Sequence, residues 1–302
     1  MRRMLRLSIL TTCSLLGLAL PRLGFAANEI VVENDIEYRN VDGQSLKLNI
    51  SRPKDGSGPY PLVIWIHGGG WAGGNRESFQ GPMQETAKQG FVAATISYRL
   101  TDANPNKPAT KNAHPAQIHD CKAAIRWLKT NADKYHLDPQ HVGVIGASAG
   151  GHLSLLAGLS DADDGLEEKT EDKAPSSRVQ AIVNIFGPTE MVSQYEGAPG
   201  VRFLVEGLCG GKPEAKPEQY KTVSPVTYLS KDDPPILTFH GTTDNIVPVQ
   251  QAKLLDEKCA AAGVTHTLVI FEGQGHGFDA EHNKEAATKS FEFFRKHLSP
   301  QP

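Results

Sequence analysis

Residues 146–151 read Gly146-Ala147-Ser148-Ala149-Gly150-Gly151, a G-x-S-x-G pattern centred on one serine. An apolar run, residues 141–145, precedes this pattern, and a helix-forming run, residues 152–157, follows it. The order predicts a strand, a sharp turn and a helix, with Ser148 at the turn. Small residues beside Ser148 allow the strand and the helix to approach closely, because a larger side chain would clash there. The free N–H groups at the start of the helix would then face the serine hydroxyl.

A G-x-S-x-G pattern also arises by chance in glycine-containing loops, so Ser148 is interpreted as a nucleophile only together with partners. The predicted strand at residues 236–239 leads to Asp244, and the one at residues 268–271 leads to His276. Taken singly, Asp244 is a turn residue or a helix cap, and His276 is a loop histidine. Because the carboxyl ends of parallel strands share one edge of a sheet, we expect all three side chains to meet there.

Each member of this predicted triad has a distinct chemical role. Serine is a poor nucleophile at neutral pH and needs a base within hydrogen-bond reach. His276 would take the serine proton and return it to the leaving alcohol. Asp244 would fix the tautomer of His276 and stabilise the imidazolium that forms.

A second glycine run, His67-Gly68-Gly69-Gly70, directly follows a buried apolar strand at residues 61–66. Glycines let backbone N–H groups approach a substrate oxygen without side-chain obstruction, which suits an oxyanion hole. We expect the hole to use the N–H groups of Gly69, Gly70 and Ala149. His67 would support the loop and would not act as a second base. Trp71 has two interpretations of equal weight: it shapes the acyl pocket of the substrate site, or it packs beneath the loop.

Predicted strands and helices alternate through most of the chain, which indicates an α/β fold with a mostly parallel sheet and helices on both faces. Residues 27–302 are predicted to form one domain. Residues 187–233 have an irregular pattern and are interpreted as an insertion with short helical pieces near the active site. Apolar periodicity predicts helices at residues 84–89 and 286–298, among others.

The first 26 residues have the pattern of a signal peptide, with cleavage expected after Ala26. Positive residues are followed by a mostly apolar run at residues 7–20 and by small residues at positions 24 and 26. The run is short for a bilayer span and contains polar residues, which argues against a membrane anchor. Cys13 lacks the small neighbour expected of a lipidation site. We therefore expect an exported protein, in the periplasm or outside the cell, without a stable membrane anchor.

Composition excludes some partners. The 302 residues include 31 basic and 34 acidic side chains, with no basic run, so nucleic acid is not expected to bind. No spacing typical of a metal site appears, and His114 and His119 are interpreted as surface or packing residues. The acidic segment at residues 160–172 is expected to be a solvated surface loop. The three cysteines after the signal peptide leave open one disulfide with a free thiol, or no disulfide.

In combination, the motifs at residues 67–71, 146–151, 240–244 and 275–278 resemble those of α/β-hydrolase carboxylesterases. They are most similar to the exported bacterial acetyl- and feruloyl-esterase-like branch, near the hormone-sensitive-lipase-like esterases. The resemblance covers residues 40–298 and implies the α/β-hydrolase fold. It also implies cofactor-free hydrolysis of short-chain or aromatic acyl esters, including esters on polysaccharides. The long N-terminal helical cap of typical hormone-sensitive-lipase-like enzymes is missing, which favours an open site.

Two alternatives belong to other functional classes. Residues 244–248 also resemble the catalytic domain of prolyl-oligopeptidase-like enzymes, although the chain has no room for their large propeller. The second alternative is a catalytically silent binding protein, which would typically have lost a member of the triad. Lactones, thioesters and formamides remain further candidate substrates, because the same triad serves each of these reactions.

Overall fold

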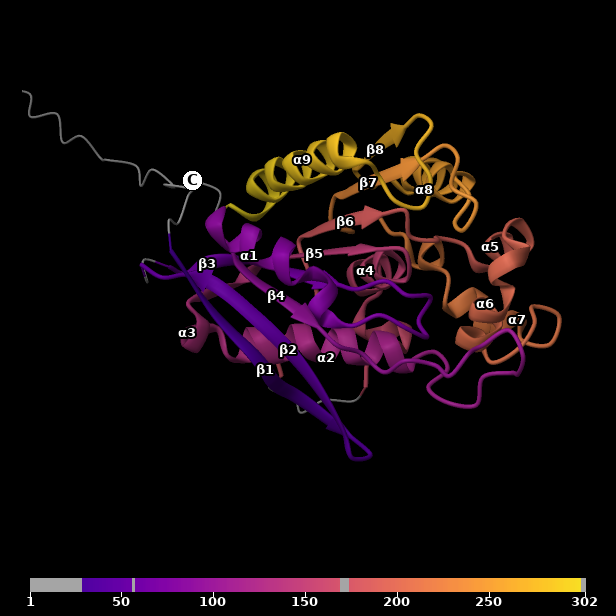
Figure 1. The fold of residues 1–302 in the computed structure, drawn as a ribbon, viewed down its shortest axis with the longest axis horizontal. Coiled ribbons are helices and arrows are strands. Elements are labelled where there is room, and N and C mark those ends of the chain that lie inside the picture. The colour runs from indigo at the N-terminus through magenta and orange to yellow at the C-terminus, as the bar shows by residue number, and fades with distance from the viewer. Residues whose placement is uncertain (1–28, 56–57, 169–173, 300–302) are drawn as a thin grey trace, which may run out of the picture.

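The computed structural model describes residues 29–55, 58–168 and 174–299. The predicted signal peptide, including Cys13, lies outside these residues. The described chain forms an eight-stranded sheet in the order β1-β2-β4-β3-β5-β6-β7-β8 (Figure 1). The strands are β1 (Ile30–Val41), β2 (Gln44–Pro53), β3 (Tyr60–Ile66), β4 (Val92–Ile96), β5 (Leu137–Ala147), β6 (Ala181–Ile185), β7 (Ile236–Gly241) and β8 (His266–Phe271). Pairing is antiparallel from β1 to β2 and from β2 to β4, and parallel between all other neighbours. The sheet is therefore mostly parallel, as the sequence predicts.

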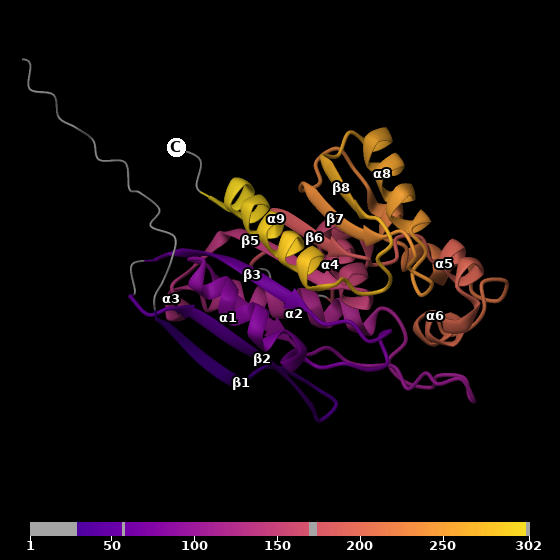
Figure 2. The ribbon, with the colours of Figure 1, turned by 45° about the horizontal axis from the view of Figure 1, so that its top comes forward.

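Helices cover both faces of the sheet (Figures 1 and 2). They are α1 (Gln80–Lys88), α2 (Ala116–Thr130), α3 (Ala132–Tyr135), α4 (Ala149–Leu159), α5 (Met191–Gly197), α6 (Arg202–Cys209), α7 (Pro217–Thr222), α8 (Gln250–Ala262) and α9 (Ala280–Leu298). Short 3-10 turns lie at Arg76–Phe79, Ala162–Asp164, Pro199–Val201 and Pro225–Tyr228. Helices α2, α4 and α8 contribute to the core on one face, and α1 and α9 to the core on the other.

The apolar runs explain the central strands. In β3, Leu62, Ile64 and Ile66 pack into the core beside α2 and α4, whereas Val63 and Trp65 pack into the core beside α1 and α9. A parallel strand between two helical layers has no solvent face, and its sequence is therefore apolar at successive positions.

Strand register brings the predicted site segments together. Ile66 lies beside Gly146, so the glycine run that follows β3 begins next to the turn that follows β5. Gly241 lies beside Phe271, so the loops that contain the predicted aspartate and histidine also emerge side by side. All four segments therefore leave the sheet at its carboxyl edge.

Two helices begin earlier than apolar periodicity predicts. Helix α9 begins at Ala280 and not at residue 286, because the Asp279 side chain caps it by accepting the His282 N–H. Residues 280–285 are mostly polar and give no periodic apolar signal. Helix α1 likewise begins at Gln80 and not at residue 84. The segment between β6 and β7 contains three helices, α5 to α7, and is more regular than predicted.

The acidic segment is not simply a solvated loop, which corrects the prediction from sequence. Its Glu167 is largely buried and pairs with Lys122 and Arg126 of α2, at 3.0 and 2.7 Å. The Lys122 ammonium is fully buried and also donates to the Ser160 carbonyl. Two positive charges from one helix therefore hold this part of the segment against the domain.

The cysteines of the described chain are free and buried: Cys121, Cys209 and Cys259. Of the two options left open by the sequence, the structure therefore has no disulfide among them. Within residues 29–55, 58–168 and 174–299, no helix combines the length and apolarity needed to cross a membrane.

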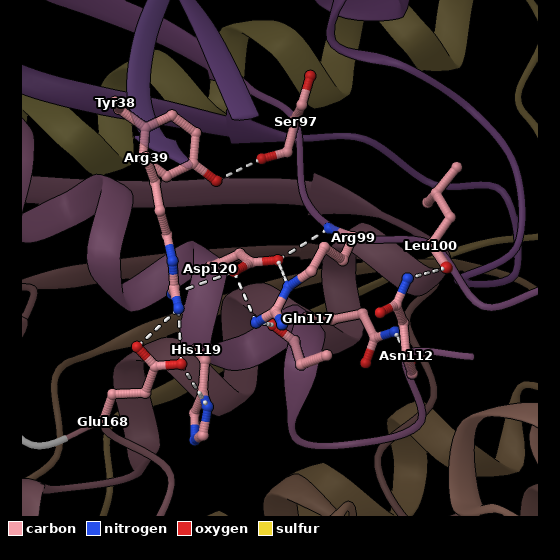
Figure 3. Close-up of polar contacts among 11 residues, drawn as sticks. Tyr38, Arg39, Ser97, Arg99, Leu100, Asn112, Gln117, His119, Asp120 and Glu168 are labelled. Carbon is pink, nitrogen blue, oxygen red and sulfur yellow. Dashed lines mark hydrogen bonds and ion pairs between the residues drawn. The ribbon is translucent and has the colours of Figure 1, made fainter. Parts of the chain in front are cut away.

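A buried ion network connects β1, the end of β4, α2 and the acidic segment (Figure 3). The Asp120 carboxylate is fully buried and accepts two bonds from the Arg99 guanidinium, at 2.8 and 2.9 Å. It also accepts the Arg99 backbone N–H, and Arg39 lies 3.1 Å away. Arg39 in turn binds Glu168. Asp120 thus fixes the point where the chain leaves β4.

We predict that Asp120→Asn lowers the free energy of unfolding by about 3 kcal/mol, because it leaves the nearly buried Arg99 guanidinium without its counter-ion. Chemical denaturation of the variant and the wild type measures the difference. Glu29→Gln is the matched control, since it removes a carboxylate from an exposed pair with Lys54 and should cost less than about 1 kcal/mol. Equal losses in the two variants would contradict the structural role of the network.

Candidate active site

Ser148 lies on a strained turn between β5 and α4. Its backbone has φ 56° and ψ −122°, a conformation that non-glycine residues rarely adopt. The Ser148 N–H donates to the Ile185 carbonyl, and the Ser148 carbonyl accepts the His152 N–H. These bonds hold the turn from β6 on one side and from α4 on the other, and the serine side chain projects from the carboxyl edge of the sheet.

The glycines around Ser148 are needed because β3, β5 and α4 approach too closely for side chains. A Cβ on Gly150 would lie 2.0 Å from the Ile66 carbonyl oxygen. A Cβ on Gly146 would lie 2.3 Å from the Gly150 carbonyl oxygen. The backbone itself would have to move to admit either, so the G-x-S-x-G pattern follows from the packing of this turn.

The structure brings Ser148, Asp244 and His276 into one hydrogen-bonded chain. The Nε2 atom of His276 lies 2.9 Å from the Ser148 hydroxyl, and its Nδ1 atom lies 2.7 Å from the Asp244 carboxylate. An ionised carboxylate can only accept, so Nδ1 carries the ring proton and Nε2 is free to accept from the serine. This is the arrangement that a serine nucleophile with a histidine base requires.

Asp244 is a fully buried carboxylate held in several directions. One of its oxygens accepts the N–H groups of Ile246 and Val247, each at 2.9 Å. The other oxygen lies 3.5 Å from Nε2 of His240, which donates mainly to the Val247 carbonyl. Burial acts to raise the pKa of Asp244, but the contacts with His240, His276 and the Val247 N–H outweigh it, and the pKa lies well below its usual range. The carboxylate therefore stays ionised.

An aromatic group that sequence reasoning missed supports His276. The Phe186 ring lies 4.6 Å from the imidazole, and Phe278 packs edge-on against Phe186. Phe186 has a positive φ of 40°, and its N–H donates to the Phe239 carbonyl. The only signal in the sequence is that this phenylalanine ends the apolar run of β6.

The glycine run after β3 lies against the serine turn. A Cβ on Gly68 would be 2.7 Å from the Ala147 carbonyl oxygen and 3.4 Å from the Ser148 Cβ. Gly69 and Gly70 have positive φ angles of 112° and 59°. The N–H groups of Gly69 and Gly70 and that of Ala149, at the first position of α4, donate to no other residue of the described chain. They are thus free for an external acceptor.

Trp71 packs beneath the glycine loop, which is one of the two interpretations that the sequence left open. Its side chain is buried, and it also lines a cavity beside Ser148. The indole N–H donates to Nδ1 of His152 at 3.1 Å, and Nε2 of His152 donates to the Val223 carbonyl at 2.7 Å. The Trp71 carbonyl accepts the Thr101 N–H. Sequence reasoning missed His152, which connects the glycine loop with the insertion.

His67 is buried behind the same loop. Its Nδ1 lies 2.8 Å from the Gly68 carbonyl, and its ring stacks on Tyr98 at 4.2 Å. Burial lowers the pKa of His67, so the ring is favoured in its neutral form. It has no contact with the triad among the bonds of the described residues, in agreement with a supporting role.

The cavity beside Ser148 is small and mostly apolar. It measures about 30 Å³. Its lining residues are Gly70, Trp71, Ser148, Pro188, Gln194, Val201, Leu204, Val205, Ile246 and Val247. Leu204 of α6 lies directly against Gly70, where an added Cβ would be 2.5 Å from a leucine methyl. The insertion therefore closes this side of the site.

No cluster in the described part of the chain has three or more side chains able to hold a metal ion. His114 is buried, and His119 lies 3.4 Å from Glu168, so both are packed residues. Burial is the main cause that lowers the pKa of His114 to about 3.

Comparisons with known proteins agree with this geometry. The BD-FAE family model matches residues 48–259. Esterase LipC of Mycobacterium tuberculosis is 34% identical over 79% of this chain, and the chain spans only 58% of LipC. A truncated carbohydrate esterase from gut microbiota aligns over 88% of this chain and 95% of its own length, with 28% identity and a TM-score of 0.71. Esterase 2 of Thermogutta terrifontis with bound propionate aligns over 93% and 98%, with 28% identity and a TM-score of 0.72. The predicted α/β-hydrolase fold and the resemblance to carboxylesterases are confirmed.

The burial of His152 leads to a prediction about how the free energy of unfolding depends on pH. Burial lowers its pKa from 6.5 to about 4, so the native state excludes a proton that the unfolded chain binds. The contribution of His152 to the free energy of unfolding is therefore fully present above about pH 6.5 and is lost as the pH drops toward 4. The loss from this ring reaches about 3 kcal/mol. His114 acts in the same direction.

We expect His152→Asn to reduce the slope of unfolding free energy against pH between 6.5 and 4, because the amide accepts from Trp71 without titrating. Denaturation at a series of pH values measures this slope. His136→Asn is the control, since His136 is exposed and its left-handed backbone suits asparagine. If the slope for His152→Asn equals that for the wild type, the claim that His152 is buried and neutral in the native state is wrong.

Proposed function

Because the chain belongs to the BD-FAE family, we propose that it is an exported serine carboxylic-ester hydrolase acting on short-chain acyl esters through an acyl-enzyme. The observation that carries the proposal is the continuous hydrogen-bonded chain from Ser148 through His276 to Asp244. A silent binding protein does not need this chain of contacts. The printed names of the relatives, which include esterases and a carbohydrate esterase, support the same class.

In the proposed reaction, the Ser148 oxygen attacks the ester carbonyl while its proton passes to Nε2 of His276. The imidazolium is stabilised by Asp244, which remains ionised. His276 then gives the proton to the alcohol oxygen as the carbon–oxygen bond breaks, which leaves an acyl group on Ser148. A water molecule then attacks the acyl-enzyme while its proton passes to His276. The proton returns to the Ser148 oxygen as the acid leaves, which restores the free serine.

The carbonyl oxygen becomes an anion in both steps. The unused N–H groups of Gly69, Gly70 and Ala149 lie on the two segments that meet at Ser148. We assign them to the oxyanion hole, where one donor lowers the barrier by roughly 3–4 kcal/mol. Trp71, held by His152 and Thr101, keeps the glycine segment in place.

The small cavity supports acetyl as the preferred acyl group. The leaving alcohol must lie next to His276, which gives it a proton, so the acyl chain points to the other side of the serine. The cavity beside Gly70 and Leu204 lies there, and His276 is not among its lining residues. The small size of this cavity, about 30 Å³, favours a methyl group over a feruloyl ring.

The alcohol side is proposed to be an acetylated polysaccharide. The similarity to the carbohydrate esterase from gut microbiota supports this part of the proposal. Export is consistent with a polysaccharide substrate, because a large polymer stays outside the cell. The basic N-terminal residues, the apolar run at residues 7–20 and the small residues before position 27 support export.

We predict that Ser148→Ala reduces hydrolysis of p-nitrophenyl acetate at least about 10⁴-fold, since the nucleophile is lost. Thermal unfolding should show that the variant remains folded. Ser154→Ala is the matched control, a serine of the adjoining helix α4 whose hydroxyl donates to the Gly150 carbonyl and does not reach the triad. Activity near the wild-type level in Ser148→Ala would refute the assigned nucleophile.

The same assay should include methyl ferulate, acetylated xylan and an aminoacyl-proline amide. Turnover of acetyl esters without amide cleavage is the expected result. Amide cleavage would favour the peptidase alternative, and no turnover of any compound would favour the binding protein.

The acyl cavity makes a separate prediction. Leu204→Ala should raise the ratio of kcat/KM for p-nitrophenyl butyrate to that for the acetate about 10-fold, because it opens the cavity wall beside Gly70. Leu229→Ala is the control, since Leu229 is similarly half-buried and does not line the cavity. An unchanged ratio would place the acyl chain elsewhere.

A further inference from the structure

A second hollow lies on the far side of helix α6 from Ser148. It measures about 340 Å³ and is formed by the loop at residues 104–109, by α6 and by the turn at residues 210–212. We call it the loop–α6 groove. Its side-chain lining consists mainly of Asn104, Asn106, Lys107, Phe203, Glu206 and Lys212. No catalytic residue of the proposed triad belongs to this groove.

Helix α6 separates the groove from the acyl cavity. Val201, Leu204 and Val205 face Ser148, whereas Phe203, Glu206 and Gly207 face the groove. On a helix with 3.6 residues per turn, these two sets lie on nearly opposite sides. A helix with its side chains is about 10 Å wide. A small ester therefore cannot occupy both places, but a chain of several sugar units can.

The groove walls are fixed in position. Asp102 accepts the backbone N–H groups of Thr110 and Lys111 and so closes the loop on itself. These bonds hold the pKa of Asp102 well below its usual range, and the bond from the Thr110 N–H has the largest effect. At its end the loop donates the His114 N–H to the Leu208 carbonyl of α6. The groove is thus a built feature of the fold.

The loop is also connected to the active site. At its start, the Thr101 N–H donates to the Trp71 carbonyl, next to the oxyanion segment. Ala103 packs against Gly207 of α6, where an added Cβ would lie 2.4 Å from the alanine methyl. The groove and Ser148 are therefore two positions on the same carboxyl edge of the sheet, joined by short segments.

The chemistry of the lining points to a neutral, polyhydroxylated ligand. Phe203 is half-exposed and offers an apolar ring face, and two amides offer donors and acceptors together. Glu206 is oriented by the Tyr195 hydroxyl at 2.9 Å and adds an acceptor. Lys107 and Lys212 add donors. A carboxylate among the ammonium groups disfavours polyanions, and the charged and amide side chains of the lining disfavour lipids.

We propose that the loop–α6 groove binds a stretch of neutral polysaccharide several units away from the ester that Ser148 cleaves. The groove would hold the polymer while the acetyl group enters the cavity beside Leu204. This proposal rests on the proposed function, because it takes an acetylated polysaccharide as the substrate. It adds a binding site whose effect depends on substrate length.

The test uses the chain from residue 27 and the variant Phe203→Ala. We expect KM for acetylated xylan to rise about 10-fold with kcat unchanged, and kcat/KM for p-nitrophenyl acetate to stay at the wild-type value. Phe203→Tyr should restore the wild-type KM, because it keeps the ring. Phe293→Ala is the matched control, a half-buried phenylalanine of α9 outside the groove.

A second variant covers the case in which Phe203→Ala disturbs α6 and so changes p-nitrophenyl acetate turnover. Asn106→Ala removes an exposed amide from the groove and keeps the backbone bond from residue 106 to the Asn104 side chain. It should also raise KM for acetylated xylan, by about 3-fold. An unchanged KM for the polymer in both variants would overturn the proposal.

Binding without turnover separates the groove from the proposed reaction. In affinity electrophoresis through soluble deacetylated xylan and glucomannan, we expect at least one polymer to retard the wild type, and Phe203→Ala to migrate without retardation. This result would support the groove even if acetylated xylan were not hydrolysed, in which case the polysaccharide part of the proposed function would be wrong. Equal migration of the two proteins in both gels would overturn the groove, whatever the esterase activity.

Discussion

The site depends on one steric constraint: β3, β5 and α4 meet with no room for side chains. The Ile66 carbonyl lies 2.0 Å from the place where a Cβ of residue 150 would be, and Gly146 faces Gly150 with similar closeness. This contact forces the sharp turn that holds Ser148 at φ 56°. It also places the segment after Ile66 directly beside the serine. The proposed nucleophile and the proposed oxyanion segment are therefore positioned by the same packing, and the strain at the serine is balanced by the surrounding sheet.

The remaining parts of the site are fixed by loops that hold one another. Trp71 receives a bond from Thr101 and gives one to His152, and His152 continues to Val223 in the insertion. Asp120 and Arg99 fix the start of the loop that contains Thr101 (Figure 3). Leu204 presses on Gly70 from the opposite side. The proposed oxyanion segment is thus held by three elements that are distant in sequence, which would suit a group that must not move as charge develops on the substrate.

Sequence reasoning was able to predict the sheet, and the meeting of Ser148, Asp244 and His276 at its carboxyl edge, because both depend on local patterns. Continuous apolar runs mark buried parallel strands, and Asp244 and His276 follow such strands. The N-terminal turn of α9 was missed because its cap, Asp279, acts through a backbone bond without an apolar signal. His152, Phe186 and the burial of Glu167 were missed for another reason. Their partners, Val223, His276 and Lys122, are 71, 90 and 45 residues away, and no local pattern in one sequence reports such contacts.

The measurement that tests the account most directly is covalent capture of the nucleophile. A structure of the similar Thermogutta terrifontis esterase 2 is phosphorylated by paraoxon. Paraoxon incubated with this protein should transfer one diethylphosphoryl group per chain, and peptide mass spectrometry should place that group on Ser148. His276→Ala should slow the labelling at least about 10³-fold, because the base is gone. Labelling at another residue, or an equal rate in the two proteins, would contradict the claim that Ser148 and His276 act as one catalytic unit.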